Sequence, residues 1–495
     1  MHIFNIRKGF ATNSSSSHSI LELPESIDTK NLKTDTYDDF NWNFFTASNK
    51  ESKENYLAYT VKLNLMQKQK TEDEINQFLV KLFGEEIIFM IHNVGIDHQS
   101  VIALPLNWNG KDLNEEFIKE LIDYIHQDKI VIVGGNDNDE ETHELVEDDY
   151  LSPINSFPKD VIESHNVARK DQDYWTIFNR ENGQKMRFSF INSEAPTKAT
   201  APELADIKIT DFCPYACSFC YQDSTTEGQH ASLENIRKIA DELEKAKVFE
   251  VACGGGETTL HPNFIEILKI FKERNIVPNF TTKNLNLFRQ SNAKEIIEHC
   301  GAMAFSVQSK DEMLKVKNAF MDFDERERVQ ASSYIFMTDS KKQSIWNPKI
   351  TFQVVLGTMP TKEFKDMMLL ASEFGSRITL LGYKENGRGS SFAPNDYSEW
   401  LDIVAKIKEK KHVEVSIDTA LASEYEHLLK DKKVNEKTYH TTEGTFSVYI
   451  DATKMSFAPS SYIGLEQSQP FNSNWLDQYV SMKAKPEYRK TIRIK

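Results

Sequence analysis

The central part of the chain alternates short apolar runs with amphipathic stretches. Between about residues 205 and 382, each apolar run is followed by a stretch in which apolar positions recur with a helical period. This alternation is typical of parallel strands, because each of them needs a crossover that is usually a helix. We expect six strands, with the sequences DIKIT, VFEVA, IVPNFTT, AMAFSVQ, ITFQVVL and RITLL. The pattern therefore predicts an α/β protein with a partial (β/α)6 TIM-like barrel as its core.

The first part of the chain has the pattern of a further α/β region. The stretch TEDEINQFLVKLFG begins with a capping box, Thr71 to Glu74, and ends at Gly84, so it predicts a helix. The runs EIIFMI (86–91) and IVIV (130–133) predict strands on either side of a helical LNEEFIKELIDYIHQD. The segments YWTIFN and KMRFSF, joined by a turn with Asn-Gly, predict a β-hairpin.

These patterns divide the 495 residues into three regions, in keeping with the usual size of a domain. Residues 1–195 are expected to form an N-terminal α/β region that ends in the hairpin, and residues 196–390 the barrel. Residues 391–495, with an amphipathic DYSEWLDIVAKIKEK and strand-like TFSVYI and KMSFA, are expected to form a smaller C-terminal α+β region. The polar stretch at 193–203 is typical of a linker.

Charge and composition restrict the partners. The chain carries 59 Lys and Arg against 75 Asp and Glu, which gives a formal charge of −16. This balance disfavours nucleic acid and anionic membrane surfaces, which are bound largely through basic side chains. The chain has neither an apolar N-terminal signal nor an apolar run long enough to span a bilayer, so we expect no membrane contact and a cytoplasmic location.

Three of the five cysteines lie within eight residues, in DFCPYACSFCYQ directly after the first barrel strand. Thiolates bind iron strongly, and three of them leave one iron of a [4Fe–4S] cluster without a protein ligand. That iron can accept a small chelating molecule. A zinc site is the alternative, with His230, Cys253 or Cys300 as the fourth ligand, and the spacing by itself leaves both open.

A second motif, CGGGETTLHP at 253–262, follows the second strand. Its glycines allow the backbone to approach a ligand without obstruction by side chains, although a tight turn between strand and helix would use them in the same way. Neither of the glycine-rich phosphate-binding motifs is present in the loop.

The spacing C-x3-C-x2-C after one strand and Gly-Gly-Glu after the next resembles the radical S-adenosylmethionine (SAM) superfamily, over roughly residues 205–390. The resemblance implies that Cys213, Cys217 and Cys220 bind a [4Fe–4S] cluster. It also implies a SAM site with the backbone of Phe219 near the adenine and a Gly-Gly-Glu motif at the amino group. The residues implied to contact SAM are Phe219, Gly255, Gly256, Glu257, Ser306, Gln353 and Arg388.

The resemblance further implies reductive cleavage of SAM to a 5′-deoxyadenosyl radical for C–H activation, with a reductant such as a flavodoxin or ferredoxin. A peptide or protein is the leading substrate, because long segments flank the barrel on both sides. The rival interpretation is a non-catalytic iron–sulfur or zinc protein with a sensing or structural role. An RNA-modifying enzyme of the same superfamily is disfavoured by the acidic charge.

Some positions depart from the superfamily pattern. Thr258 stands where proline commonly follows Gly-Gly-Glu, a change we expect to affect only the stiffness of the turn. No cysteine follows Cys300, which argues against auxiliary clusters in the C-terminal region, and Cys253 and Cys300 are expected to be buried apolar thiols. The serine run Ser14–Ser17 is typical of a mobile polar segment, and a sharper hypothesis is that Ser14–His18 is itself modified or recognised.

Overall fold

The computed structural model divides into two compact units, with the main boundary between Pro196 and Thr197. In the C-terminal part the structure describes residues 198–330, 349–374, 377–408, 413–434, 438–463 and 465–482. In the N-terminal part it describes residues 2–7, 17–22, 39–40, 45–67, 70–84, 87, 95–96, 115–128, 130–135, 166–171, 174–180, 183 and 185–189. Nearly all of the strand predicted at 86–91, and most of the serine run, lie outside these residues.

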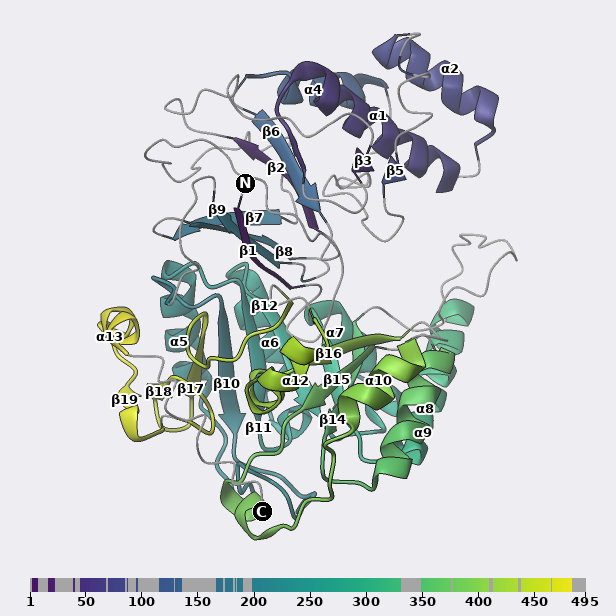
Figure 1. The fold of residues 1–495 in the computed structure, drawn as a ribbon. Helices are drawn as coiled ribbons and strands as arrows, with labels where there is room; N and C mark the ends of the chain where they lie inside the picture. Colours follow the sequence, from purple (N-terminus) through teal and green to yellow (C-terminus); the bar gives the residue numbers. More distant parts are fainter. Residues whose placement is uncertain are drawn as a thin grey trace. The chain divides into compact units, whose positions relative to one another are not determined.

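The C-terminal unit is built on one large sheet in which the six predicted strands lie side by side, parallel and in chain order. They are β10 (Leu204–Thr210), β11 (Glu250–Gly255), β12 (Val277–Thr282), β13 (Met303–Ser306), β14 (Ile350–Val355) and β15 (Arg377–Leu381). The helices between them cover the outer face of the sheet (Figure 1). They are α5 (Leu233–Lys245), α6 (Phe264–Glu273), α7 (Ala293–His299), α8 (Lys310–Gln330) and α9 (Thr361–Phe374). The predicted α/β barrel fold is confirmed.

The last hundred residues add strands to both sides of this sheet. On one side β16 (Glu414–Ile417) pairs in parallel with β15, and on the other β17 (Ser447–Asp451) pairs in parallel with β10. Two antiparallel strands, β18 (Ser456–Ala458) and β19 (Gln469–Pro470), follow β17. The helices of this segment are α10 (Trp400–Lys408), α11 (Thr419–Glu424), α12 (Glu426–Asp431) and α13 (Trp475–Ser481). The described strands after residue 390 thus extend the barrel sheet on both sides.

The described end of the predicted linker also belongs to the barrel unit. The amide of Ala199 donates to the carbonyl of Thr445, and the amide of Glu203 donates to the carbonyl of Phe446. Ala199, Ala201 and Glu203 are buried. The linker prediction is wrong for residues 198–203. Their polar composition does not reveal that their backbone pairs with a segment distant in sequence.

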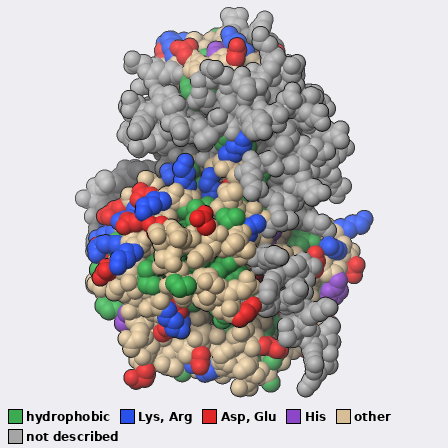
Figure 2. All heavy atoms as spheres, turned by 90° about the vertical axis from the view of Figure 1, so that its left-hand side faces the viewer, with side chains coloured by type: hydrophobic (Ala, Val, Ile, Leu, Met, Phe, Trp, Pro, Cys, Tyr) green, Lys and Arg blue, Asp and Glu red, His purple; other side chains and the backbone are tan. Residues whose placement is uncertain are grey.

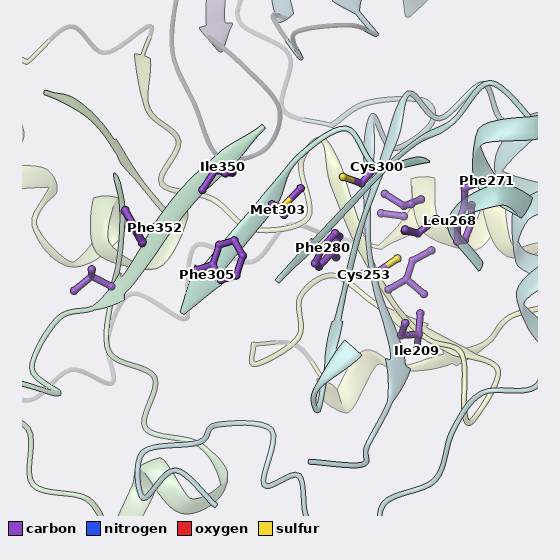
Figure 3. Packing of buried hydrophobic residues seen from close by; sticks show 14 of the residues in the cluster. Ile209, Cys253, Leu268, Phe271, Phe280, Cys300, Met303, Phe305, Ile350 and Phe352 are labelled. Carbon is purple, nitrogen blue, oxygen red and sulfur yellow. The ribbon is translucent and has the colours of Figure 1, made fainter. Parts of the chain in front are cut away.

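The core lies between the sheet and its helices. Alternate residues along each strand point to the same face, so every second strand residue packs under the helices. Figure 3 shows this core, with buried strand residues such as Phe280, Phe305 and Phe352 and the helix residues Leu268 and Phe271. The residues between them, such as Ser306 and Gln353, point to the opposite, inner face of the sheet.

The sheet is curled. The ammonium of Lys384, three residues beyond β15, lies 4.7 Å from the ring centre of Tyr221, which follows β10. The order of the sheet puts β11, β12, β13 and β14 between these two strands. Loops at the carboxyl ends of distant strands therefore meet at one mouth of the barrel, which is where such folds carry their chemistry.

The outer surface carries mixed charges. Exposed pairs on and beside α5 join Lys238 to Glu234 at 2.7 Å and Arg237 to Glu266 at 3.0 Å. Figure 2 shows acidic and basic side chains close together on one described face of the molecule. Among the helices that the structure describes, none combines the length and apolar content needed to cross a bilayer.

The N-terminal unit contains the predicted hairpin, β8 (Tyr174–Asn179) and β9 (Lys185–Ser189), in an antiparallel sheet with β7 (Asn166–Asp171) and β1 (His2–Arg7). A second antiparallel sheet joins β2 (Ser17–Glu22), β6 (Ile130–Gly135) and β4 (Phe45–Ala47), and β3 (Asp39–Phe40) pairs with β5 (Gly95–Ile96). Its helices are α1 (Lys50–Gln67), α2 (Glu72–Phe83) and α4 (Glu115–Ile125). The predicted capping box of α2 is confirmed, with Thr71 and Glu74 each bonded to the backbone of the other.

Candidate functional site

The three clustered cysteines lie on the loop that leaves β10, at the mouth of the barrel. Cys213, Cys217 and Cys220 are all partly buried, and their thiols are free. The loop folds back on itself, because the amide of Cys213 donates to the carbonyl of Thr225 at 2.8 Å and that of Cys220 to the carbonyl of Cys217 at 3.2 Å. The folded loop therefore presents three thiols on one short segment, which fits the predicted [4Fe–4S] cluster.

The alternative zinc site lacks a fourth ligand. Nδ1 of His230 lies 2.8 Å from the hydroxyl of Thr210, and no group of three or more His, Cys, Asp or Glu side chains in the described parts of the chain is placed to hold one metal ion. Cys253 and Cys300 are only 1% and 3% exposed, in the core. The thiols of a cubane bond to different irons and need not converge on one point, so the geometry favours the cluster.

The two remaining cysteines are buried apolar thiols, as expected. Figure 3 shows both within the core between the sheet and the helices. Burial raises the pKa of Cys253 to about 12 and that of Cys300 to about 11, because a thiolate would be poorly solvated there. Buried thiols of this kind pack as small apolar side chains and are chemically inert.

The glycine loop after β11 lies directly against the cysteine loop. The amide of Gly256 donates to the carbonyl of Thr210 at 2.7 Å, and the next amide, of Glu257, to the carbonyl of Phe212 at 2.8 Å. A Cβ atom on Gly256 would lie 2.1 Å from the Phe212 carbonyl oxygen. Gly255 has φ +107°, and its Cβ would lie 2.2 Å from the carbonyl oxygen of Thr210. Both positions require glycine so that the two loops can meet.

The carboxylate of Glu257 points into the protein and is only 2% exposed. Its Oε1 accepts hydrogen bonds from the amide and the hydroxyl of Thr259 and from the hydroxyl of Thr282. Its Oε2 accepts one from the amide of Lys283 at 2.8 Å. The side chain thus ties the glycine loop to the end of β12, and its contact with the amino group of SAM stays a prediction.

Thr258 does more than alter the stiffness of the turn. Its hydroxyl donates to the carbonyl of Thr281 at 2.7 Å, and the residue is fully buried. A proline at this position would lack the donor. The expectation that this departure affects only the turn is therefore wrong, because the side chain adds a second link between the glycine loop and β12.

Ser306 and Gln353 are neighbours on the inner face of the sheet. They are paired in register between β13 and β14. The amide oxygen of Gln353 lies 3.3 Å from the hydroxyl of Thr281, which donates to it. The structure thus brings the two predicted residues together on the barrel wall, and their contact with SAM stays a prediction.

Arg388 lies against the cysteine loop. Its Nε donates to the carbonyl of Cys217 at 2.9 Å, its Nη1 to Oδ1 of Asp223 at 2.9 Å and its Nη2 to the carbonyl of Ser224 at 3.0 Å. Sequence reasoning missed these partners, since nothing in the sequence indicates that loops 164 or more positions apart meet. Its predicted contact with SAM stays a prediction.

Phe219, in the cysteine loop, contacts the segment after β15 that also carries Arg388. Its ring packs edge-on against that of Phe392, with 6.0 Å between the centres. The predicted contact of its backbone with adenine stays a prediction.

Burial and two nearby cations act in opposite directions on the pKa of the Cys217 thiol. Burial raises the pKa of Cys213 and Cys217, since it disfavours the thiolate. The positive charges of Lys283 and Arg388 oppose this shift at Cys217. Iron binds the thiolate, so these cations favour the form that binds.

Comparison with known proteins assigns this part of the barrel. Residues 207–331 match the family model of the radical SAM superfamily. They form a radical SAM domain. The domain begins within β10 and includes the cysteine loop, the glycine loop and Ser306. The match agrees with the resemblance predicted from the cysteine and glycine motifs.

Curated relatives match part of the chain at low identity. Mycofactocin maturase MftC of Mycobacterium ulcerans is 23% identical over 196 residues, which is 38% of this chain and 50% of the relative. The MftC of Mycolicibacterium smegmatis is 24% identical over 195 residues, 38% of this chain and 47% of the relative. The chain thus spans about half the length of the curated relatives it matches.

The solved structures similar to this chain have lower sequence identity to it than the curated relatives do. SuiB of Streptococcus suis bound to S-adenosylmethionine aligns with a TM-score of 0.45 and 13% identity, over 66% of this chain and 90% of SuiB. SuiB bound to the precursor peptide SuiA aligns with a TM-score of 0.47 and 12% identity, over 66% of this chain and 89% of SuiB.

Proposed function

We propose that this protein is a radical SAM enzyme that cleaves SAM reductively and uses the resulting radical on a peptide or protein substrate. One observation carries the proposal: the β10 loop with its three free thiols lies beside a glycine loop in which Gly255 and Gly256 have no room for a Cβ atom. When bound, a reduced [4Fe–4S] cluster would supply the electron that splits SAM into methionine and a 5′-deoxyadenosyl radical, and that radical would remove hydrogen from the substrate.

The residues of the chain would hold and orient the reactants. Cys213, Cys217 and Cys220 would bind the cluster, and the backbone at Gly255 and Gly256 would approach the methionine part of SAM. Ser306 and Gln353 lie further along the inner wall, where they would hydrogen-bond SAM or the substrate. Phe219 and Arg388 complete the proposed site.

Two observations support a peptide or protein substrate. The N-terminal residues form a compact unit of their own, separate from the barrel, so the chain has more folded material than a small substrate requires. The curated relatives are named as maturases of mycofactocin. Since the chain spans only about half of their length, the substrate of this protein remains part of the proposal.

An electron donor completes the proposal. Flavodoxins and ferredoxins have the low potentials that reduction of such a cluster requires. All five cysteines are free, in keeping with a reducing compartment, and we place the protein in the cytoplasm on that ground.

The test is the formation of 5′-deoxyadenosine. The protein would be purified without oxygen, loaded with iron and sulfide, and mixed with SAM and dithionite. We expect 5′-deoxyadenosine from the wild type and from Cys253→Ala, whose thiol is buried in the core, and none from Cys217→Ala. A fully loaded protein that forms no product, with or without added peptides, would support the non-catalytic rival.

The substrate class has its own test. Peptide and small-molecule fractions would be prepared from cells grown in deuterium oxide and added to the reaction. Deuterium transferred to 5′-deoxyadenosine from the peptide fraction alone would support a peptide substrate. Transfer from the small-molecule fraction alone would overturn it.

A further inference from the structure

We propose that Arg388 is a positioning residue that holds the cysteine loop in the conformation that receives the cluster. The inference rests on the proposed cluster site and gives Arg388 a role other than contact with SAM. We call the contacts between Arg388 and the cysteine loop the clamp. Because all of these contacts are made by the protein alone, the inference also implies that the loop is ordered before any cluster binds.

The clamp uses the whole guanidinium group. Its three nitrogens donate to two backbone carbonyls and one carboxylate of the loop, at Cys217, Ser224 and Asp223. The backbone amide of Arg388 donates to a third carbonyl, that of Cys220, at 3.0 Å. A planar fork of donors suits such a set of acceptors, because several directional bonds form with little loss of side-chain freedom. Two of the three predicted cluster ligands therefore have their carbonyls bound by one residue.

Glycines on either side of Arg388 make this approach possible. Gly387 has φ +53°, and a Cβ there would lie 2.9 Å from the carbonyl oxygen of Cys220. Gly389 follows, and its carbonyl accepts a 2.7 Å hydrogen bond from the buried hydroxyl of Tyr383. The segment that carries Arg388 is thus held by a contact with Tyr383, which follows β15, and this contact does not depend on the cysteine loop.

A second cation of the same segment contacts the loop. The ammonium of Lys384 lies over the ring of Tyr221, the residue after Cys220, and 3.7 Å from a carboxylate oxygen of Asp418. Arg388 therefore contacts the loop before and after Cys220, and Lys384 contacts it at Tyr221. The Lys384 ammonium lies over a ring of the loop, whereas the Arg388 guanidinium binds its backbone carbonyls, so we assign the positioning role to Arg388.

The loop itself needs such support. Its tip, residues 214–216, is exposed, and Ala216 adopts a left-handed φ of 47° that residues other than glycine rarely adopt. Holding a loop in its bound conformation lowers the entropic cost of binding. Without the guanidinium, the carbonyls of Cys217 and Ser224 lose a donor and the loop can sample other conformations. The cluster would then be held less firmly even though all three thiols remain.

The experiment compares Arg388→Gln and Arg388→Lys with wild type and with the control Arg377→Gln. Arg377 also makes an ion pair, 2.9 Å from Glu414, but at the opposite end of β15. Hydrogen exchange of the cluster-free protein reports on the amides of Cys213, Thr225 and Gly228, which are all bonded within the loop. Loss of iron to a chelator is then followed in the loaded protein, and SAM affinity is measured on the fraction that retains its cluster.

We expect amide exchange in the loop to be at least 10-fold faster in Arg388→Gln than in wild type, and iron to be lost at least 5-fold faster. Arg388→Lys should fall between the two, because it keeps the charge without the fork, and Arg377→Gln should match wild type in the loop. Unchanged exchange and iron loss would overturn the inference, as would a lower SAM affinity with an unchanged loop. If Arg388→Gln does not fold, Arg388→Lys replaces it with the same expected direction. A wild type that binds no cluster would instead overturn the proposed function.

Discussion

The hydroxyl of Thr282, the last residue of β12, donates a 2.6 Å hydrogen bond to the carboxylate of Glu257 in the loop after β11. Both side chains are buried. The bond joins the carboxyl ends of two neighbouring strands, so the glycine loop is held by the barrel wall independently of any cofactor. Part of the Gly-Gly-Glu motif therefore serves to shape the loop.

Glu257→Gln should lower the free energy of unfolding by about 1–3 kcal/mol, the usual effect of leaving a buried donor unsatisfied. A glutamine can keep one oxygen toward Thr259 and Thr282, but its NH2 would then face the amide of Lys283, which is also a donor. Urea unfolding of the cluster-free protein measures the effect. Glu266→Gln is the control, because the pair that Glu266 makes with Arg237 is exposed. Equal stability of the two variants would contradict this role of Glu257.

The glycines of the loop should differ in their tolerance of alanine. A Cβ on Gly256 would overlap the carbonyl of Phe212, whereas a Cβ on Gly254 meets nothing within 4 Å. We expect Gly256→Ala to lower the melting temperature and to reduce the iron bound after loading, and Gly254→Ala to stay near wild type in both. Similar behaviour of the two variants would show that the loops do not meet as described.

Thr258→Val should cost about 0.5–1.5 kcal/mol of unfolding free energy, the net value of one hydrogen bond. The change keeps the shape of the side chain and removes the donor to the Thr281 carbonyl. Thr258→Ser retains the hydroxyl and should recover most of the hydrogen-bond contribution, which separates this bond from packing. The measurement is chemical denaturation of all three proteins, and failure of serine to recover stability would argue that the methyl group matters more.

The stability of the barrel should depend on pH through Glu424. Burial raises the pKa of its carboxyl to about 7, although Tyr397 donates to both oxygens at 2.9 and 2.8 Å. An unfolded glutamate titrates near about 4.3. Between these values the folded state holds a proton that the unfolded chain has lost, so this group makes stability fall as pH rises from about 4.3 to 7.

Glu424→Gln removes that penalty. Relative to wild type, its melting temperature should therefore rise between pH 5 and pH 8, while the exposed Glu399→Gln should show no such trend. Thermal unfolding at both pH values measures the difference. An offset between Glu424→Gln and wild type that is the same at pH 5 and pH 8 would contradict the raised pKa.

The six central strands and their helices could be predicted because each is a local pattern. An apolar run followed by a helical period needs no knowledge of the rest of the chain. The pairing of β17 with β10 could not be predicted, since it joins Leu204 to Ser447 across more than two hundred residues. For the same reason the sequence alone separated the last hundred residues from the barrel that they complete.

The site divides in the same way. The cysteine and glycine motifs are short segments whose spacing is itself the signal. The inward turn of the Glu257 carboxylate and the bond from Arg388 to Cys217 depend on how loops of different strands meet once the sheet has curled. Such contacts have no local signature, and only the structure shows them.

The central claim is that the cysteine loop holds a [4Fe–4S] cluster, and that SAM binds the one iron that has no protein ligand. Iron and sulfide content, followed by electron paramagnetic resonance of the reduced protein with and without SAM, tests this most directly. We predict about four irons per chain and a signal that changes when SAM is added, with both lost in Cys217→Ala. One zinc and no iron, or a cluster signal that SAM leaves unchanged, would contradict the account.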